Sequence, residues 1–116
     1  MPIIVQKYGG SSVANAELIK NVALRIGSTH DSGNQVVAVV SAMGAATDRL
    51  IELAHQITPS PTPREMDLLL STGEIVSCTL VAIALQALGY QSVSLSGGQA
   101  GIHTDTAYTR ARITGL

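Results

Sequence analysis

The segment Lys7-Tyr8-Gly9-Gly10-Ser11-Ser12 contains residue types that suit phosphate binding. A glycine pair lets the backbone approach an anion closely, and its N–H groups can hold phosphate oxygens. The adjacent lysine can neutralise charge on a transferring phosphoryl group. The segment has neither the Walker A spacing nor the G-x-G-x-x-G spacing. By itself it is equally compatible with a phosphate-binding loop and with an ordinary strand-to-helix turn.

Glu74 is the only charged residue between Leu68 and Leu88. A buried carboxylate without a partner is strongly destabilising, so a buried Glu74 would need a cationic ligand such as an amino group. The neighbouring Gly73 allows a second interpretation, in which the helix breaks there and Glu74 is exposed or caps the next helix. The local sequence leaves both open.

Hydroxyl side chains flank the small-residue turn 42–46, with Ser41 before it and Thr47 after it. Both could contact a polar ligand, although the local sequence favours Thr47 as a helix N-cap. The glycine-rich segment 97–101 could also approach a ligand, but a simple turn is favoured. The three histidines have no metal-ligand spacing, and the lone Cys78 has no cationic neighbour, so no metal site or cysteine nucleophile is expected.

The elements that must position these residues begin with a β-branched strand at Ile3–Val5. Asn15 is a good cap for a helix that ends between Gly27 and Gly33. Val36–Val40 is continuously apolar, which predicts a strand buried on both faces. Together these elements form a right-handed βαβ unit.

Two more helices are predicted downstream. One begins at Thr47 and ends at the Thr58–Pro61 breaker. The other has an N-cap, an N1 proline and a capping box at Thr62–Glu65 and extends to Gly89, with a bend or split at Gly73 as an alternative.

The alternating segment Ser92–Leu95 predicts a third parallel strand. The fold class is therefore α/β, an αβα three-layer sandwich with a mainly parallel sheet of about three to four strands in one domain. Ligands of such sheets bind beyond the carboxyl ends of the strands. The predicted ends at 7–10, 41–44 and 96–98 are all rich in glycine, serine or alanine, which places a candidate site there.

The composition narrows the class of protein. The 116 residues are 46% hydrophobic and 13% charged with net charge −1, which excludes disorder and gives no basic surface for nucleic acid. The apolar stretch at the N-terminus is too short for a signal peptide. The polar residues of segment 68–88 argue against a membrane span. A cytoplasmic protein is expected. Its apolar surface exceeds what one small domain buries, so it packs on another part or self-associates.

Several segments resemble the aspartate kinases of the amino-acid kinase family. They are Lys7-Tyr8-Gly9-Gly10-Ser11-Ser12-Val13, Val40-Ser41-Ala42-Met43-Gly44 with Thr47, Arg64-Glu65-Met66-Asp67 leading to Gly73-Glu74, and Gln99-Ala100-Gly101-Ile102. They occur in the family's order and cover essentially the whole chain. The commoner family form has Phe at Tyr8 and Thr at Ser11, and both changes keep the chemistry.

The resemblance implies transfer of the ATP γ-phosphate to the β-carboxylate of L-aspartate, the entry step to lysine, threonine, methionine and isoleucine. ATP would carry Mg²⁺, and no metal ligand is expected in the chain. Lys7 is similar to the lysine that stabilises the transferring phosphate. The resemblance also assigns the backbone of Tyr8, Gly9 and Gly10 to the ATP phosphates, and Ser41, Thr47 and Glu74 to aspartate, with Glu74 on its amino group.

The chain differs from the family's pattern at its C-terminal end, Leu116. The later Gly-Gly-Ser-Asp segment and the C-terminal ACT domains are absent. Residues 1–116 are therefore expected to be the N-terminal, substrate-binding half of the kinase domain and to be inactive alone. They would form a homo-oligomer or pack against the remainder of the kinase. The alternatives are another enzyme of the same family and a non-catalytic oligomerising or anion-binding module.

Overall fold

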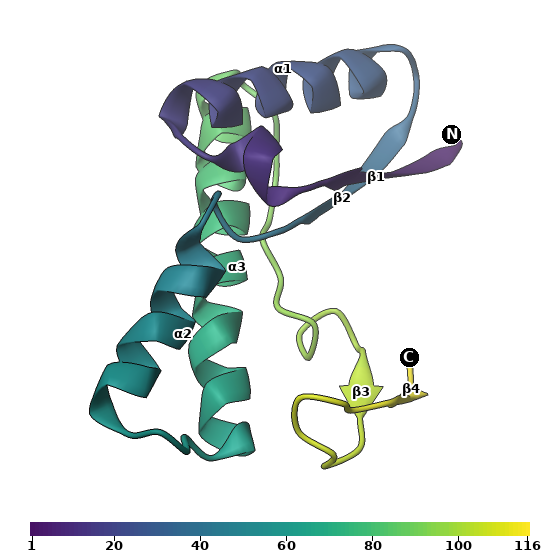
Figure 1. Ribbon diagram of the computed structural model, residues 1–116. Coiled ribbons are helices and arrows are strands. Elements are labelled where there is room, and N and C mark those ends of the chain that lie inside the picture. The colour runs from purple at the N-terminus through teal and green to yellow at the C-terminus, as the bar shows by residue number, and fades with distance from the viewer.

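The computed structural model describes all residues, Met1–Leu116, and no peptide bond is cis. The chain forms three long helices, a two-stranded parallel sheet and a small C-terminal hairpin (Figure 1). The elements in order are β1 (Ile3–Tyr8), the 3-10 helix η1 (Gly10–Val13), α1 (Ala16–Asp31), β2 (Gln35–Val40), α2 (Ala46–Ile57), α3 (Pro63–Ala87), β3 (His103–Thr104) and β4 (Ile113–Gly115).

The predicted βαβ unit is confirmed. β1 and β2 pair in parallel from Ile3↔Gln35 to Tyr8↔Val40, and α1 makes the crossover between them. Asn15 is the N-cap of α1, because its side-chain oxygen accepts a hydrogen bond from the Leu18 N–H at 2.9 Å. Figure 1 shows α1 above the two strands and roughly alongside them, with α3 running at a steep angle to both.

One face of this sheet packs on the helices and forms the hydrophobic core. Side chains of β1 and β2 alternate, so every second residue points towards α1 and α3. The buried cluster consists of Tyr8, Val13, Ile19, Val22, Ala23, Ile26, Val81 and Leu85. The α/β class with parallel strands is confirmed. Within this chain α1 and α3 lie on one face of the sheet, and α2 packs on α3.

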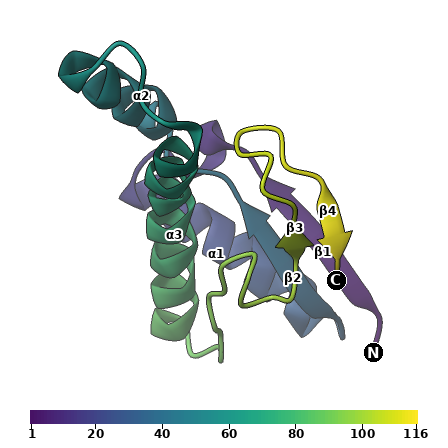
Figure 2. The same cartoon turned by 90° about the horizontal axis from the view of Figure 1, so that it is seen from below.

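The opposite face of the sheet carries Ile3, Val5, Val37 and Val39, which are between 50% and 66% exposed. Figure 2, viewed from below, shows α1 behind the sheet and no helix in front of it. The prediction that Val36–Val40 is buried on both faces is therefore wrong for this chain, because only one helix layer is present to cover it. The expected excess of apolar surface is confirmed.

α3 is one continuous helix, so the alternative of a split at Gly73 is wrong. Thr62 is at the N-cap position and Pro63 begins the helix, as predicted, but the capping box does not form. The Glu65 carboxylate instead accepts a hydrogen bond from the Arg64 guanidinium at 2.9 Å. Gly89 ends the helix as predicted, with a φ of 91° that few other residues adopt.

The predicted third strand at Ser92–Leu95 is wrong, since this segment pairs with neither strand of the sheet. It runs along α3 instead. The Ser92 hydroxyl donates to the Ala82 carbonyl at 2.9 Å, and the Gln86 side chain donates to the Ser92 carbonyl at 3.2 Å. These bonds hold the serine side of the segment against the helix and turn Val93 and Leu95 outwards.

The C-terminal hairpin lies apart from the parallel sheet (Figure 1). Its strands β3 and β4 are antiparallel and short. It is attached to the start of α3 by the Thr109 N–H, which donates to the Asp67 carboxylate at 2.8 Å.

By length and composition α3 could cross a membrane, which is weak evidence by itself. Its positions Ser77, Val81 and Leu85 are buried, and the helix packs on α1, α2 and β2. Of its most apolar 18-residue window, 28% is buried in the chain.

Candidate active site

The loops that follow β1 and β2 touch each other directly. The Gly44 N–H donates to the Gly10 carbonyl at 2.9 Å. A Cβ atom at Gly10 would lie only 2.8 Å from the Ala42 carbonyl oxygen, so this close approach requires glycine at position 10. The predicted meeting of two glycine-rich strand ends is therefore present in the structure.

α3 reaches the same point through Gly73. A Cβ atom there would lie 3.0 Å from the Ala42 Cβ. Gly73 is buried inside the helix, so it permits close packing of α3 on the β2–α2 loop. Ala42, 5% exposed, is thus the meeting point of the β1 loop, the β2 loop and α3.

Ser77, one turn along α3 from Gly73, joins α3 to the end of β2 by a hydrogen bond. It is fully buried, and its hydroxyl donates to the Ser41 carbonyl at 2.6 Å while lying 3.1 Å from the Glu74 carbonyl. The Ser41 N–H in turn donates to the Tyr8 carbonyl at 3.0 Å. The Ser77 hydroxyl therefore links α3 to Ser41, and the Ser41 N–H links that segment to Tyr8 on β1.

The loop after β1, which is the candidate phosphate-binding segment, has backbone N–H groups that form no hydrogen bond within their turn. The first backbone bond of η1 runs from the Ser12 N–H to the Gly9 carbonyl at 3.0 Å, so the N–H groups of Gly10 and Ser11 have no acceptor one turn back. Lys7, at the end of β1, is exposed and forms no ion pair within the chain. These groups are available to an anion.

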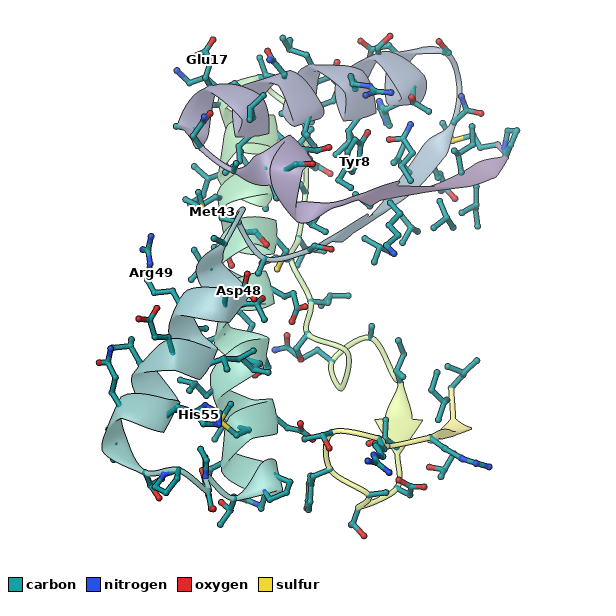
Figure 3. All side chains as sticks on the ribbon, viewed as in Figure 1. Tyr8, Glu17, Met43, Asp48, Arg49 and His55 are labelled. Atoms are coloured by element: carbon teal, nitrogen blue, oxygen red, sulfur yellow. The ribbon has the colours of Figure 1, made fainter.

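Tyr8 has a structural side chain. It is 6% exposed, and its hydroxyl donates to the Gln6 side chain at 2.9 Å. The Arg25 guanidinium lies 6.0 Å from the ring centre. Figure 3 shows Tyr8 between β1 and α1, so only its backbone remains for the predicted phosphate contact.

Thr47 lies in the first turn of α2, but it is not the N-cap. Ala45 occupies that position, and no side chain caps the helix. The N-cap prediction for Thr47 is wrong, because the turn enters the helix two residues earlier. Thr47 is half-buried and precedes the exposed pair Asp48 and Arg49, which Figure 3 shows at the start of α2.

Glu74 lies on α3 directly after Gly73 and is exposed, without an ion-pair partner in the chain. Of the two local interpretations, burial is wrong, and the second is correct on exposure but wrong on the helix break. The carboxylate is not buried, and the helix does not break beside it. What places it is the contact of Gly73 with Ala42, which brings this turn of α3 to the loop that carries Ser41 and Thr47.

Two concave regions lie elsewhere. One of about 310 Å³ is lined by polar and apolar residues of α3 and segment 94–99, and one of about 530 Å³ is an apolar groove between α1 and α3. Neither contains Lys7, Thr47 or Glu74. No group of three or more His, Cys, Asp or Glu side chains is placed to hold a metal ion.

The sequence reasoning missed Ala42 and Ser77. Ala42 has no polar side-chain group, and Ser77 is one of several hydroxyl residues on α3, so neither residue type stands out. The signal that could have found Ser77 is its spacing of four residues from Gly73, which puts two small residues on one side of the helix.

An α/β fold whose glycine-rich loops meet at the carboxyl ends of parallel strands defines a class of ligand-binding α/β domains. Comparison with known families narrows the class. The profile described as "Amino acid kinase family" matches residues 2–115, and the chain belongs to this family.

The sequence is similar to curated aspartokinases. It is 55% identical over 113 residues to the aspartokinase of Mycolicibacterium smegmatis, covering 97% of this chain and 27% of that protein. It is 53% identical over 116 residues to the aspartokinase of Geobacillus stearothermophilus, covering 100% of this chain and 28% of that protein. The chain therefore spans about a quarter of the length of these relatives.

The structure is similar to the crystal structure of aspartate kinase from Synechocystis. The TM-score is 0.79 with 55% sequence identity, and the match covers 80% of this chain and 16% of that chain. The sequence resemblance and the α/β fold thus agree.

Proposed function

We propose that this chain is the part of an aspartokinase that binds L-aspartate and the phosphates of ATP. The reaction transfers the γ-phosphoryl group of ATP to the β-carboxylate oxygen of aspartate, leaving ADP and aspartyl phosphate. The observation that carries the proposal is the convergence on Ala42 of the three segments that bear Lys7, Thr47 and Glu74. The similarity to aspartokinases supports it.

The β1 loop provides the phosphate side of the site. The N–H groups of Gly10 and Ser11 have no acceptor in their turn, and Lys7 is exposed at the end of the strand. Backbone donors and an ammonium group stabilise the charge that develops on a transferring phosphoryl group. Mg²⁺ would arrive on the nucleotide.

The β2–α2 loop and α3 provide the aspartate side. Thr47 offers a hydroxyl, Ser41 lies at the end of β2, and Glu74 offers a carboxylate that has no cation within the chain. A carboxylate in this state suits the ammonium group of an amino acid. Catalysis would come from positioning and charge stabilisation, with aspartate held beside the phosphate side of the site.

The test is a chimera in which this chain replaces the 113 matched residues of the M. smegmatis aspartokinase. The product is trapped with hydroxylamine as aspartyl hydroxamate, and ADP release is measured in parallel. We expect an active chimera in which Lys7→Ala lowers kcat by at least about a hundredfold, the effect of removing one charge-stabilising donor. Lys20→Ala, an exposed lysine on α1, is the matched control and should leave kcat unchanged.

Glu74→Gln should raise the KM for aspartate, since it removes the charge that faces the amino group. A folded chimera that is inactive, or one that is indifferent to both Lys7→Ala and Glu74→Gln, would contradict the proposal. Preference for glutamate over aspartate in the hydroxamate assay would assign the chain to another enzyme of the family.

The chain alone should not turn over ATP and aspartate, because the proposed site is the N-terminal, substrate-binding half of a kinase domain. In the cell the complete enzyme would be cytoplasmic and would serve lysine, threonine and methionine biosynthesis. Turnover by the purified 116-residue chain, abolished by Lys7→Ala, would contradict its predicted inactivity.

A second candidate function is a non-catalytic, self-associating module. The observation that favours it is the exposed apolar sheet face of Ile3, Val5, Val37 and Val39. Light scattering of the isolated chain distinguishes the cases. Oligomers that dissociate when Val37 and Val39 are replaced by threonine would support association through this face, and a monodisperse monomer would exclude it.

A further inference from the structure

Ser77 is the only buried polar residue of the chain, and no part of the proposed chemistry uses it. It lies on α3 between turns that bear apolar side chains. A buried hydroxyl is destabilising unless it forms hydrogen bonds, so its partners indicate its role. Its bond to the Ser41 carbonyl joins α3 to the end of β2, whereas the Glu74 carbonyl lies three residues back on the same helix.

We propose that Ser77 is a positioning residue, which sets the place of Glu74 relative to the β2 loop and thereby the fit of the amino-acid substrate. The inference rests on the proposed function and adds a residue to it. The short bond, 2.6 Å from the Ser77 hydroxyl to the Ser41 carbonyl, joins elements 36 residues apart in sequence.

The contacts around Ser77 fix α3 against the β2 loop in two directions. Gly73 allows the helix to approach until a Cβ at that position would lie 3.0 Å from the Ala42 Cβ, which limits how close α3 can come. The Ser77 bond opposes movement of the helix away from the loop or along its own axis, because hydrogen bonds weaken steeply with distance and angle. Glu74 lies between these two contacts on the same helix. Its carboxylate has no ion-pair partner of its own, so its place depends on them.

Loss of the Ser77 hydroxyl should therefore weaken the binding of aspartate more than the binding of ATP. Ser77→Ala in the chimera is expected to raise the KM for aspartate on the order of tenfold, since a small displacement of a substrate-positioning group has effects of this size or larger. The KM for ATP should stay at the wild-type value. A purely structural role would instead reduce the folded fraction, lowering apparent kcat and leaving both KM values unchanged.

Matched variants separate positioning from general loss of a hydroxyl. Ser71, on the same helix, donates to the Leu68 carbonyl at 2.7 Å within α3. Ser71→Ala should change neither KM. Ser77→Cys keeps the volume and a weak donor, so it should give an intermediate KM for aspartate, and it replaces the alanine variant if that one does not fold.

The double variant tests whether Ser77 acts through Glu74. In a Glu74→Gln background, Ser77→Ala should raise the KM for aspartate little further, because residues that act through one another are not additive. If Glu74→Gln raises this KM and Ser77→Ala does not, the positioning role is wrong while the proposed function stands. If the folded wild-type chimera is inactive, the proposed function fails, and the role assigned to Ser77 fails with it.

Discussion

The packing of α3 on the β2–α2 loop predicts an unusual response to Gly73→Ala. In the middle of a helix this substitution normally stabilises by about 1 kcal/mol, because alanine has the higher helix propensity. Here the new Cβ would lie 3.0 Å from the Ala42 Cβ. The favourable separation of carbon atoms is about 3.5–4.0 Å.

The contact cannot be relieved by a change of rotamer. The Ala42 Cβ is attached directly to the backbone, so either the helix or the loop must move. Overpacking of this kind costs about 1–3 kcal/mol. We therefore expect Gly73→Ala to give a net destabilisation of roughly 1 kcal/mol, the difference between the packing cost and the propensity gain.

A double-mutant cycle measures the contact directly. Ala42→Gly removes the opposing methyl group, so in that background Gly73→Ala should recover its stabilisation of about 1 kcal/mol. The free energy of unfolding of all four proteins is obtained from urea titrations followed by circular dichroism. Stabilisation by Gly73→Ala in the wild-type background, or additive effects in the cycle, would refute the reasoning.

Three further predictions concern the loop, the first helix and the turn after α3. Gly10→Ala should lower the free energy of unfolding by about 1–3 kcal/mol in urea titrations, because the new Cβ would lie 2.8 Å from a backbone oxygen. Gly9→Ala is the control and should be tolerated, since nothing lies within 4 Å of a Cβ at that position. Asn15→Ala should cost about 1 kcal/mol through loss of the α1 cap, and Asn15→Asp should preserve most of it; equal losses in the two variants would contradict the cap. The pKa of Tyr90 is raised by its hydrogen bond to Asp31, and further by partial burial of the ring and by the charge of the carboxylate. The bond therefore contributes fully to stability below the pKa of an unfolded tyrosine. This contribution is lost as the pH rises through the pKa of Tyr90 in the folded protein. The melting temperature should accordingly fall more steeply with alkaline pH in the wild type than in Tyr90→Phe, and equal slopes would contradict the linkage.

The sequence correctly predicted the helix ends that depend only on neighbouring residues. The Asn15 cap, the Pro63 start and the Gly89 end of the helices are all in place, since each depends on the backbone of neighbouring residues. The parallel pairing of Val36–Val40 with the first strand also followed from an apolar run joined by a single helix.

The predictions that failed concern residues whose structure depends on partners distant in sequence or on the path of a whole helix. Ser92–Leu95 has a strand-like alternation, but its serines bond to the nearby helix α3, so it stays out of the sheet. Glu74 was expected to be buried or to lie at a helix break, and it is exposed on a continuous helix. Sequence periodicity cannot distinguish these cases, because the competing hydrogen bonds come from residues that only the fold brings near.

The sequence by itself determined the α/β class, the glycine-rich loop after β1 and the family to which the chain belongs, because these depend on residue type, order and short spacing. Only the tertiary structure decided that Gly10, Gly73 and Ser77 meet around Ala42. That meeting depends on close contact between elements more than 30 residues apart in sequence, such as the Ser77 hydroxyl and the Ser41 carbonyl with a separation of 36. Steric limits and one buried hydrogen bond set it. The spacing of Gly73 and Ser77 marks one side of α3, but the local sequence does not identify Ala42 and Ser41 as its partners.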